Sequence, residues 1–98
     1  MIPANNQHLI NMRIDREMAR SISKHGLWNE HTYEMMMGFI SDELDVEVLS
    51  AVNRKDFFGE HGAFTELAQV VVTAQKMMHQ ILEREGMDGT EVSLSPSP

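Results

Sequence analysis

AFTELAQVVVTAQKMMHQILER, residues 63–84, carries apolar side chains at spacings of three and four positions. An α-helix has 3.6 residues per turn, so this spacing predicts a helix from about Ala63 to Arg84 with one apolar seam. The three consecutive valines favour a strand locally, but the surrounding period outweighs a preference of three residues. The seam consists of Phe64, Leu67, Val71, Ala74, Met78 and Ile81.

A second amphipathic helix is expected upstream, from about Glu34 to Arg54. Phe39, Val46 and Leu49 lie away from its main stripe, so more than one neighbour must cover this helix. The glycine-containing connection to residue 63 is short, which makes the two helices antiparallel. The main stripe consists of Met37, Ile40, Leu44, Val48 and Ala51.

The N-terminal third is expected to supply one more helix. Residues 1–8 show no periodicity and predict a flexible lead-in with a helix cap at Asn5 or Asn6. The helix should begin near Leu9 and end at Gly26, followed by a connection over residues 27–32. Residues 86–98 have the composition of a disordered tail, so the domain covers residues 9–85. The apolar residues of this first helix recur at every fourth position: Ile10, Ile14, Met18 and Ile22.

The fold class is therefore all-α, with three main helices per chain forming a bundle. A chain of 98 residues buries little surface alone, and without cysteine it has neither disulfides nor thiolate zinc sites. We expect oligomerisation to complete the bundle, as a homodimer or a homotetramer.

Charge and hydropathy limit the classes of partner that the chain is expected to bind. The net charge of −7 argues against direct binding of nucleic acid, which relies on clustered Lys and Arg. No apolar run approaches the roughly 20 residues that a membrane span requires, and no signal peptide precedes the first helix. No membrane association and a cytoplasmic location are expected.

An acidic segment, SDELDVEV, lies in the middle of the second helix. On a wheel of 100° per residue, Glu47 falls inside the apolar arc and Glu43 lies about 40° away, whereas Asp42 and Asp45 face solvent. Glu66 flanks the apolar seam of the following helix and should face the same interhelical space. These carboxylates are either a cation site or long side chains that are solvated or paired with Lys or Arg.

Three segments in this order resemble the MazG-like, all-α nucleoside triphosphate pyrophosphohydrolases. They are KHG (24–26), ELDVEVLSAVNRKD (43–56) and ELAQV (66–70). The family carries an E-E-x-x-E pattern on one helix and E-x-x-D on the next, which together bind Mg²⁺. In the register that we prefer, Glu43 opens the first pattern and Glu47 closes it, so Leu44 occupies the position of the second Glu. If Asp42 and Glu43 open the pattern instead, Val46 occupies the closing position. Gln69 stands where the family usually has Asp, which should lower metal affinity because an amide supplies no charge.

The resemblance implies hydrolysis of a nucleoside triphosphate to the monophosphate and pyrophosphate with Mg²⁺, or with Mn²⁺. Glu43, Glu47 and Glu66 would be the metal ligands, one of them orienting the attacking water, and Gln69 a weaker participant. Lys24 and Lys76 would meet phosphate, although a solvated helix surface explains them more simply. Trp28 and Asn29 would contact the base, with a loop anchor as the simpler explanation for Trp28.

The alternative function is a catalytically inactive helical oligomer that acts as a nucleotide sensor or protein-interaction module.

The histidines and methionines do not indicate a metal site. The five histidines lack the HxxxH or HxxH spacing of a zinc site, so scattered surface positions are expected. The nine methionines are expected to fill the core.

Overall fold

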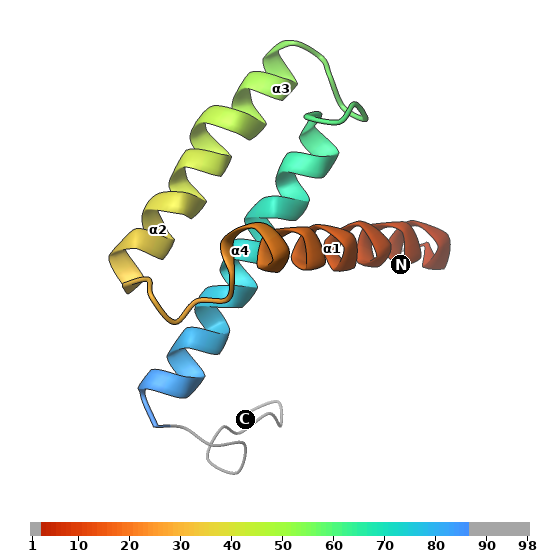
Figure 1. The fold of residues 1–98 in the computed structure, drawn as a ribbon. Coiled ribbons are helices and arrows are strands. Elements are labelled where there is room, and N and C mark those ends of the chain that lie inside the picture. Colours follow the sequence, from red (N-terminus) through yellow and green to blue (C-terminus); the bar gives the residue numbers. More distant parts are fainter. Residues whose placement is uncertain (1–2, 87–98) are drawn as a thin grey trace, which may run out of the picture.

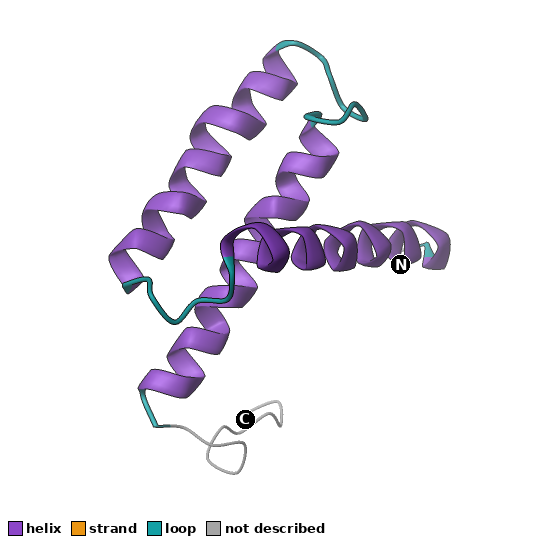
Figure 2. Cartoon of the chain, in the orientation of Figure 1, coloured by secondary structure: helices purple, strands orange, loops and turns teal. Residues whose placement is uncertain are grey.

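The predicted helix of residues 63–84 is present as α4 (Ala63–Arg84) and forms the centre of the molecule. The computed structural model describes residues 3–86. Figure 1 shows α4 antiparallel to a second long helical rod and crossed near its middle by α1 (Ala4–His25). All regular structure within residues 3–86 is helical, which confirms the all-α class (Figure 2).

The predicted second helix runs as three consecutive helical segments. They are α2 (Tyr33–Asp42), the π-helical turn η1 (Glu43–Val48) and α3 (Leu49–Asn53). Thr32 caps the start, because its side chain accepts a hydrogen bond of 3.1 Å from the backbone nitrogen of Met35. Within η1 the hydrogen bonds span five residues, as from the Leu49 nitrogen to the Leu44 oxygen. The acidic segment of the sequence is therefore the π-helical turn.

The π-helical turn corrects the apolar stripe predicted for this rod. Met37 and Val48 would lie about 20° apart in a regular α-helix, and Met36 about 120° from Val48. The turn adds about one residue, which brings Met36 onto the face of Val48 instead. Met36 and Val48 are accordingly buried, whereas Met37 is 54% exposed and Leu44 is 46% exposed.

The first helix begins earlier than expected. Its N-cap is Pro3 rather than Asn5 or Asn6, so most of the expected lead-in is helical. Proline can precede or open a helix because the first N–H groups have no intrahelical partner. The helix ends as predicted: Gly26 has a φ of 76° and donates its N–H to the Ile22 oxygen. The predicted C-terminal tail lies outside the described residues, apart from Gly86.

The core of the chain uses a polar face of α4. Thr65, Lys76 and Gln80 are buried beside Ala68 and Val72. The predicted apolar seam is largely uncovered, as Leu67, Met78 and Ile81 are 45%, 63% and 40% exposed. Within residues 3–86, no helix combines the length and apolar character needed to cross a bilayer.

Candidate functional site

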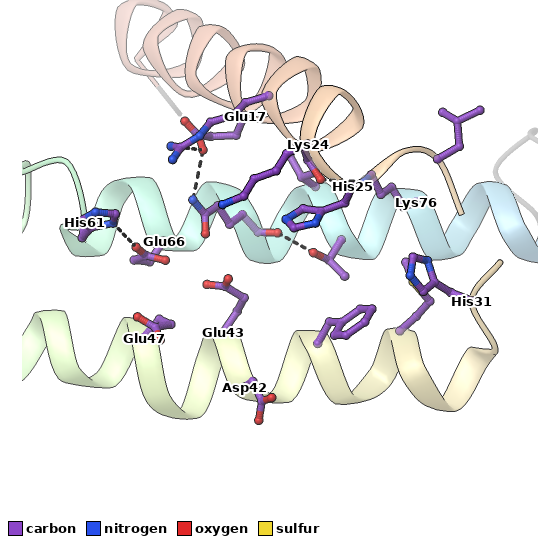
Figure 3. A pocket seen from close by; sticks show the side chains of 18 residues that line it. Glu17, Lys24, His25, His31, Asp42, Glu43, Glu47, His61, Glu66 and Lys76 are labelled. Carbon is purple, nitrogen blue, oxygen red and sulfur yellow. Dashed lines mark hydrogen bonds and ion pairs between the residues drawn. The ribbon is translucent and has the colours of Figure 1, made fainter. Parts of the chain in front are cut away.

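A cavity of about 520 Å³ lies where α1, the α2–η1 rod and α4 face one another (Figure 3). Two sets of charged side chains line it, together with His25, His31 and His61. We call Glu43, Glu47 and Glu66 the acidic group, and Arg20, Lys24 and Lys76 the basic group. One cavity therefore holds both charge types that a metal–phosphate ligand requires.

The side chains of the acidic group come from η1 and from the first turn of α4. Glu66 is only 3% exposed, Glu43 is half-buried and Glu47 is exposed, although the wheel placed Glu47 inside the apolar arc. Burial, the closeness of the Glu66 carboxyl and the negative charges of the neighbouring carboxylates together raise the pKa of Glu43 to about 7, with burial as the largest cause. The Oε2 atom of Glu43 is buried without a hydrogen-bond partner. This crowding favours a proton or a cation at Glu43.

The alternative of pairing with a basic side chain finds no support in the described part of the chain. Within residues 3–86, no Lys or Arg forms an ion pair with the acidic group. Asp42 and Asp45 are exposed, as expected, and Asp45 accepts a hydrogen bond of 3.1 Å from Ser41. Asp42 also borders the cavity, with its side chain directed away from α4 (Figure 3).

His61 extends the acidic end of the cavity. Its Nδ1 lies 3.5 Å from Oε1 of Glu66. The preceding loop is held by Asp56, whose Oδ1 accepts a hydrogen bond of 2.9 Å from the Gly59 nitrogen. Gly62 is required by close packing, since a Cβ there would lie 2.7 Å from that same nitrogen. His61 is thus presented to the cavity by a compact loop, and its side chain is 65% exposed, as expected of a surface histidine.

Glu17 on α1 is a buried carboxylate that sequence reasoning missed. It is 3% exposed and accepts a hydrogen bond of 3.2 Å from Nε2 of Gln69. Guanidinium nitrogens of Arg13 and Arg20 lie 3.7 Å from it. The signal in the sequence was weak: Glu17 lies about 60° from Ile14 on the wheel, between two arginines spaced to pair with it. Gln69 therefore lines the cavity with its amide nitrogen already engaged.

The two lysines predicted to meet phosphate both line the cavity but differ in environment. Lys76 is 5% exposed, and its ammonium donates to Oγ of Ser21 at 2.6 Å and to the Gly26 oxygen at 3.1 Å. Burial lowers its pKa. Lys24 is exposed. Lys76 thus ties α4 to the end of α1, and Lys24 is the freer cation.

Trp28 and Asn29, which were expected to contact the nucleobase, are not among the described residues that line the cavity. Trp28 stacks on His79, with ring centroids 4.6 Å apart, and donates from Nε1 to Glu83 at 2.9 Å. The Asn29 oxygen accepts a hydrogen bond of 3.1 Å from Arg84. Both residues anchor the 26–32 connection to α4, which is the simpler role considered for Trp28.

A divalent cation fits this site only if substrate phosphates and water supply some of its ligands. No three His, Asp or Glu side chains of residues 3–86 are grouped closely enough to hold a metal by themselves. Mg²⁺, however, is commonly bound by one or two carboxylates together with substrate phosphates and water. The unpartnered oxygen of Glu43 beside Glu66 matches that pattern.

Comparisons with protein-family models, with curated proteins and with solved structures gave no significant match. The MazG-like resemblance therefore stays a prediction from the three sequence segments. The function has to be argued from the cavity itself.

Proposed function

We propose that this protein is a cytoplasmic, Mg²⁺-dependent nucleoside triphosphate pyrophosphohydrolase. The observation that carries the proposal is the placement of the acidic and basic groups around one cavity. A triphosphate needs both, since its oxygens bind cations directly and bind carboxylates through a metal ion. Mn²⁺ has the same preference for oxygen ligands and is the expected substitute.

In the reaction, water attacks the α-phosphorus, the bond to the α–β bridging oxygen breaks, and pyrophosphate leaves with that oxygen. Mg²⁺, when bound, supplies charge neutralisation and lowers the pKa of coordinated water. Glu43 and Glu66 would hold it, because they carry the buried, crowded oxygens. Glu47 is exposed at the cavity and would orient the water.

The basic group would bind the phosphates. Lys24 and Arg20 lie on α1, and Arg20 is directed by its ion pair with buried Glu17. Lys76 is buried and keeps one N–H beyond its two hydrogen bonds, so it would contribute mainly positive potential. Gln69 would add a neutral oxygen, which makes slow turnover the expected behaviour.

The test is release of pyrophosphate from a panel of normal and damaged nucleoside triphosphates with Mg²⁺. Glu66→Gln should abolish it. Asp45→Asn is the matched control, because Asp45 lies on the same rod, is exposed and is not among the described cavity residues. If the wild-type protein releases pyrophosphate from none of the substrates, the enzyme proposal is refuted.

A second copy of the chain is proposed to cover the apolar seam of α4. Leu67, Met78 and Ile81 are substantially exposed on one helix face, which costs free energy in water. A homodimer or homotetramer would bury them. Light scattering at micromolar concentration tests this, and a stable folded monomer would contradict it.

The alternative is a catalytically inactive oligomer that senses nucleotides or binds another protein. Gln69 favours it, since this position supplies no charged ligand to the cavity and its amide nitrogen is already bonded to Glu17. A sensor would show a higher melting temperature with Mg²⁺ and nucleotide but no pyrophosphate release. An interaction module would respond to neither.

A further inference from the structure

The end of the cavity away from the acidic group has a different chemistry. Figure 3 shows His31 at one end of the cavity and Glu66 and His61 at the other. Leu27 and Phe39 line the cavity and are 46% and 42% exposed, and His31 is half-buried. The rings of His31 and Phe39 meet edge to face, with centroids 5.4 Å apart. Exposed apolar and aromatic surface in a cavity suits a flat, apolar-faced ligand.

His31 adds one unsatisfied polar atom to this end. Its Nδ1 is buried and has no hydrogen-bond partner. A buried polar atom of this kind is costly until something bonds to it. Neutral imidazole can present Nδ1 as a donor or as an acceptor, so it can meet either an amino or a carbonyl edge.

The connection that carries His31 is fixed from outside the cavity. Gln80, fully buried in α4, donates from Nε2 to the His31 oxygen at 2.6 Å and to the Trp28 oxygen at 3.2 Å. The Trp28 ring is held in its stack on His79. Trp28 is therefore occupied as an anchor, and the position of His31 is set before any ligand arrives.

We propose that Leu27, His31 and Phe39 form the nucleobase subsite of the cavity, where a turn of the His31 ring lets Nδ1 bond to the polar edge of the base. The inference rests on the proposed function. Phe39 precedes Glu43 by four residues, about 6 Å along the helix axis. The base and the metal-bound phosphates of one nucleotide would then lie along the same rod, with the sugar between them.

The experiment compares two probes by calorimetry in the presence of Mg²⁺. The first is a set of non-hydrolysable α,β-imido nucleoside triphosphates that carry each of the common bases. The second is inorganic tripolyphosphate, which has no base. His31→Leu and Phe39→Ala should weaken binding of the nucleotide analogues about tenfold, as expected for loss of one stacking or hydrogen-bonding contact. Both should leave the tripolyphosphate affinity unchanged.

Two further variants separate recognition from a folding defect. His31→Asn keeps a polar atom near the position of Nδ1 and should retain most of the affinity for the analogues. Trp28→Phe is the control for an anchor and should affect the two probes equally, if at all. Melting temperatures check that each variant is folded.

The outcomes distinguish the two proposals. If tripolyphosphate binds the wild-type protein as tightly as the analogues, or if His31→Leu and Phe39→Ala lose both probes equally, the base subsite is refuted while phosphate binding stands. Selective loss of the analogues in Trp28→Phe would move the base to Trp28 and also refute it. If neither probe binds the wild-type protein, the proposed function fails together with this subsite.

Discussion

Replacing Glu43 by Gln should stabilise the metal-free protein at pH 8. Burial and the neighbouring carboxylates raise the pKa of Glu43 from 4.5 to about 7. The protonated carboxyl therefore contributes stability that is fully present below pH 4.5 and is lost as the pH rises through about 7. Gln resembles the protonated form at every pH, so the variant should keep the stability that the wild-type protein loses.

The structure sets the magnitude. A rise of the pKa from 4.5 to about 7 corresponds at most to about 3.5 kcal/mol, at about 1.4 kcal/mol per pH unit. Glu43 is only half-buried, so solvent screening reduces this to about 1–2 kcal/mol. For a domain of this size, the melting temperature should rise by about 5–10 °C at pH 8 and stay nearly unchanged at pH 4.5.

The assay is thermal unfolding by circular dichroism from pH 4.5 to 8, with EDTA and then with Mg²⁺. Mg²⁺ should raise the melting temperature of the wild-type protein at pH 8 but not that of Glu43→Gln. Asp45→Asn, on the same turn but exposed, should behave like the wild-type protein. A Glu43→Gln variant that is less stable than the wild-type protein at pH 8 without metal would refute the reasoning.

Three further predictions, two of them with a control or second-site variant, test the scaffold and the wall of the cavity. Gly62→Ala should lower stability by more than about 1 kcal/mol in denaturant titrations, because its Cβ would lie 2.7 Å from a backbone nitrogen; Gly38→Ala, with open space around it, should be neutral or stabilising. Gln80→Ala should cost about 1–3 kcal/mol in the same measurement, since two carbonyls of the 26–32 connection lose their buried donor. Gln69→Asp should lower the melting temperature by placing a second carboxylate against buried Glu17; adding Glu17→Gln should restore it and tighten Mg²⁺ binding, and a double variant no more stable than the single one would contradict this.

The sequence predicted the helices well where the signals are local. The bounds of α4 and the end of α1 at Gly26 follow from apolar spacing and from one glycine with positive φ. The start of α1 was missed because its first turns, residues 4–8, are polar and carry no apolar period. Apolar spacing and single glycines report only on neighbouring residues, so they do not reveal a helix that is stabilised by contacts with distant parts of the chain.

The site was predicted in part for the same reason. Helix geometry was enough to bring Glu43 and Glu66 to one space, because both lie on helices joined by a short connection. Lys76 and Gln80 were missed as buried residues, since each is satisfied by carbonyls of a connection about 50 residues away in sequence. A polar side chain reads as solvated until its distant partner is known.

The π-helical turn also determines how the rod would respond to the loss of one residue between the two ends of the proposed nucleotide site. Phe39 lies before η1, and Glu47 lies within it. Losing one residue between 43 and 48 would let the turn close as ordinary α-helix and leave the residues on either side on their present faces, because the turn accommodates one extra residue. A deletion of one residue between Phe39 and Glu43 would instead rotate Phe39 by about 100° against Glu43 and Glu47, so that the proposed base subsite and the acidic group would no longer face one cavity.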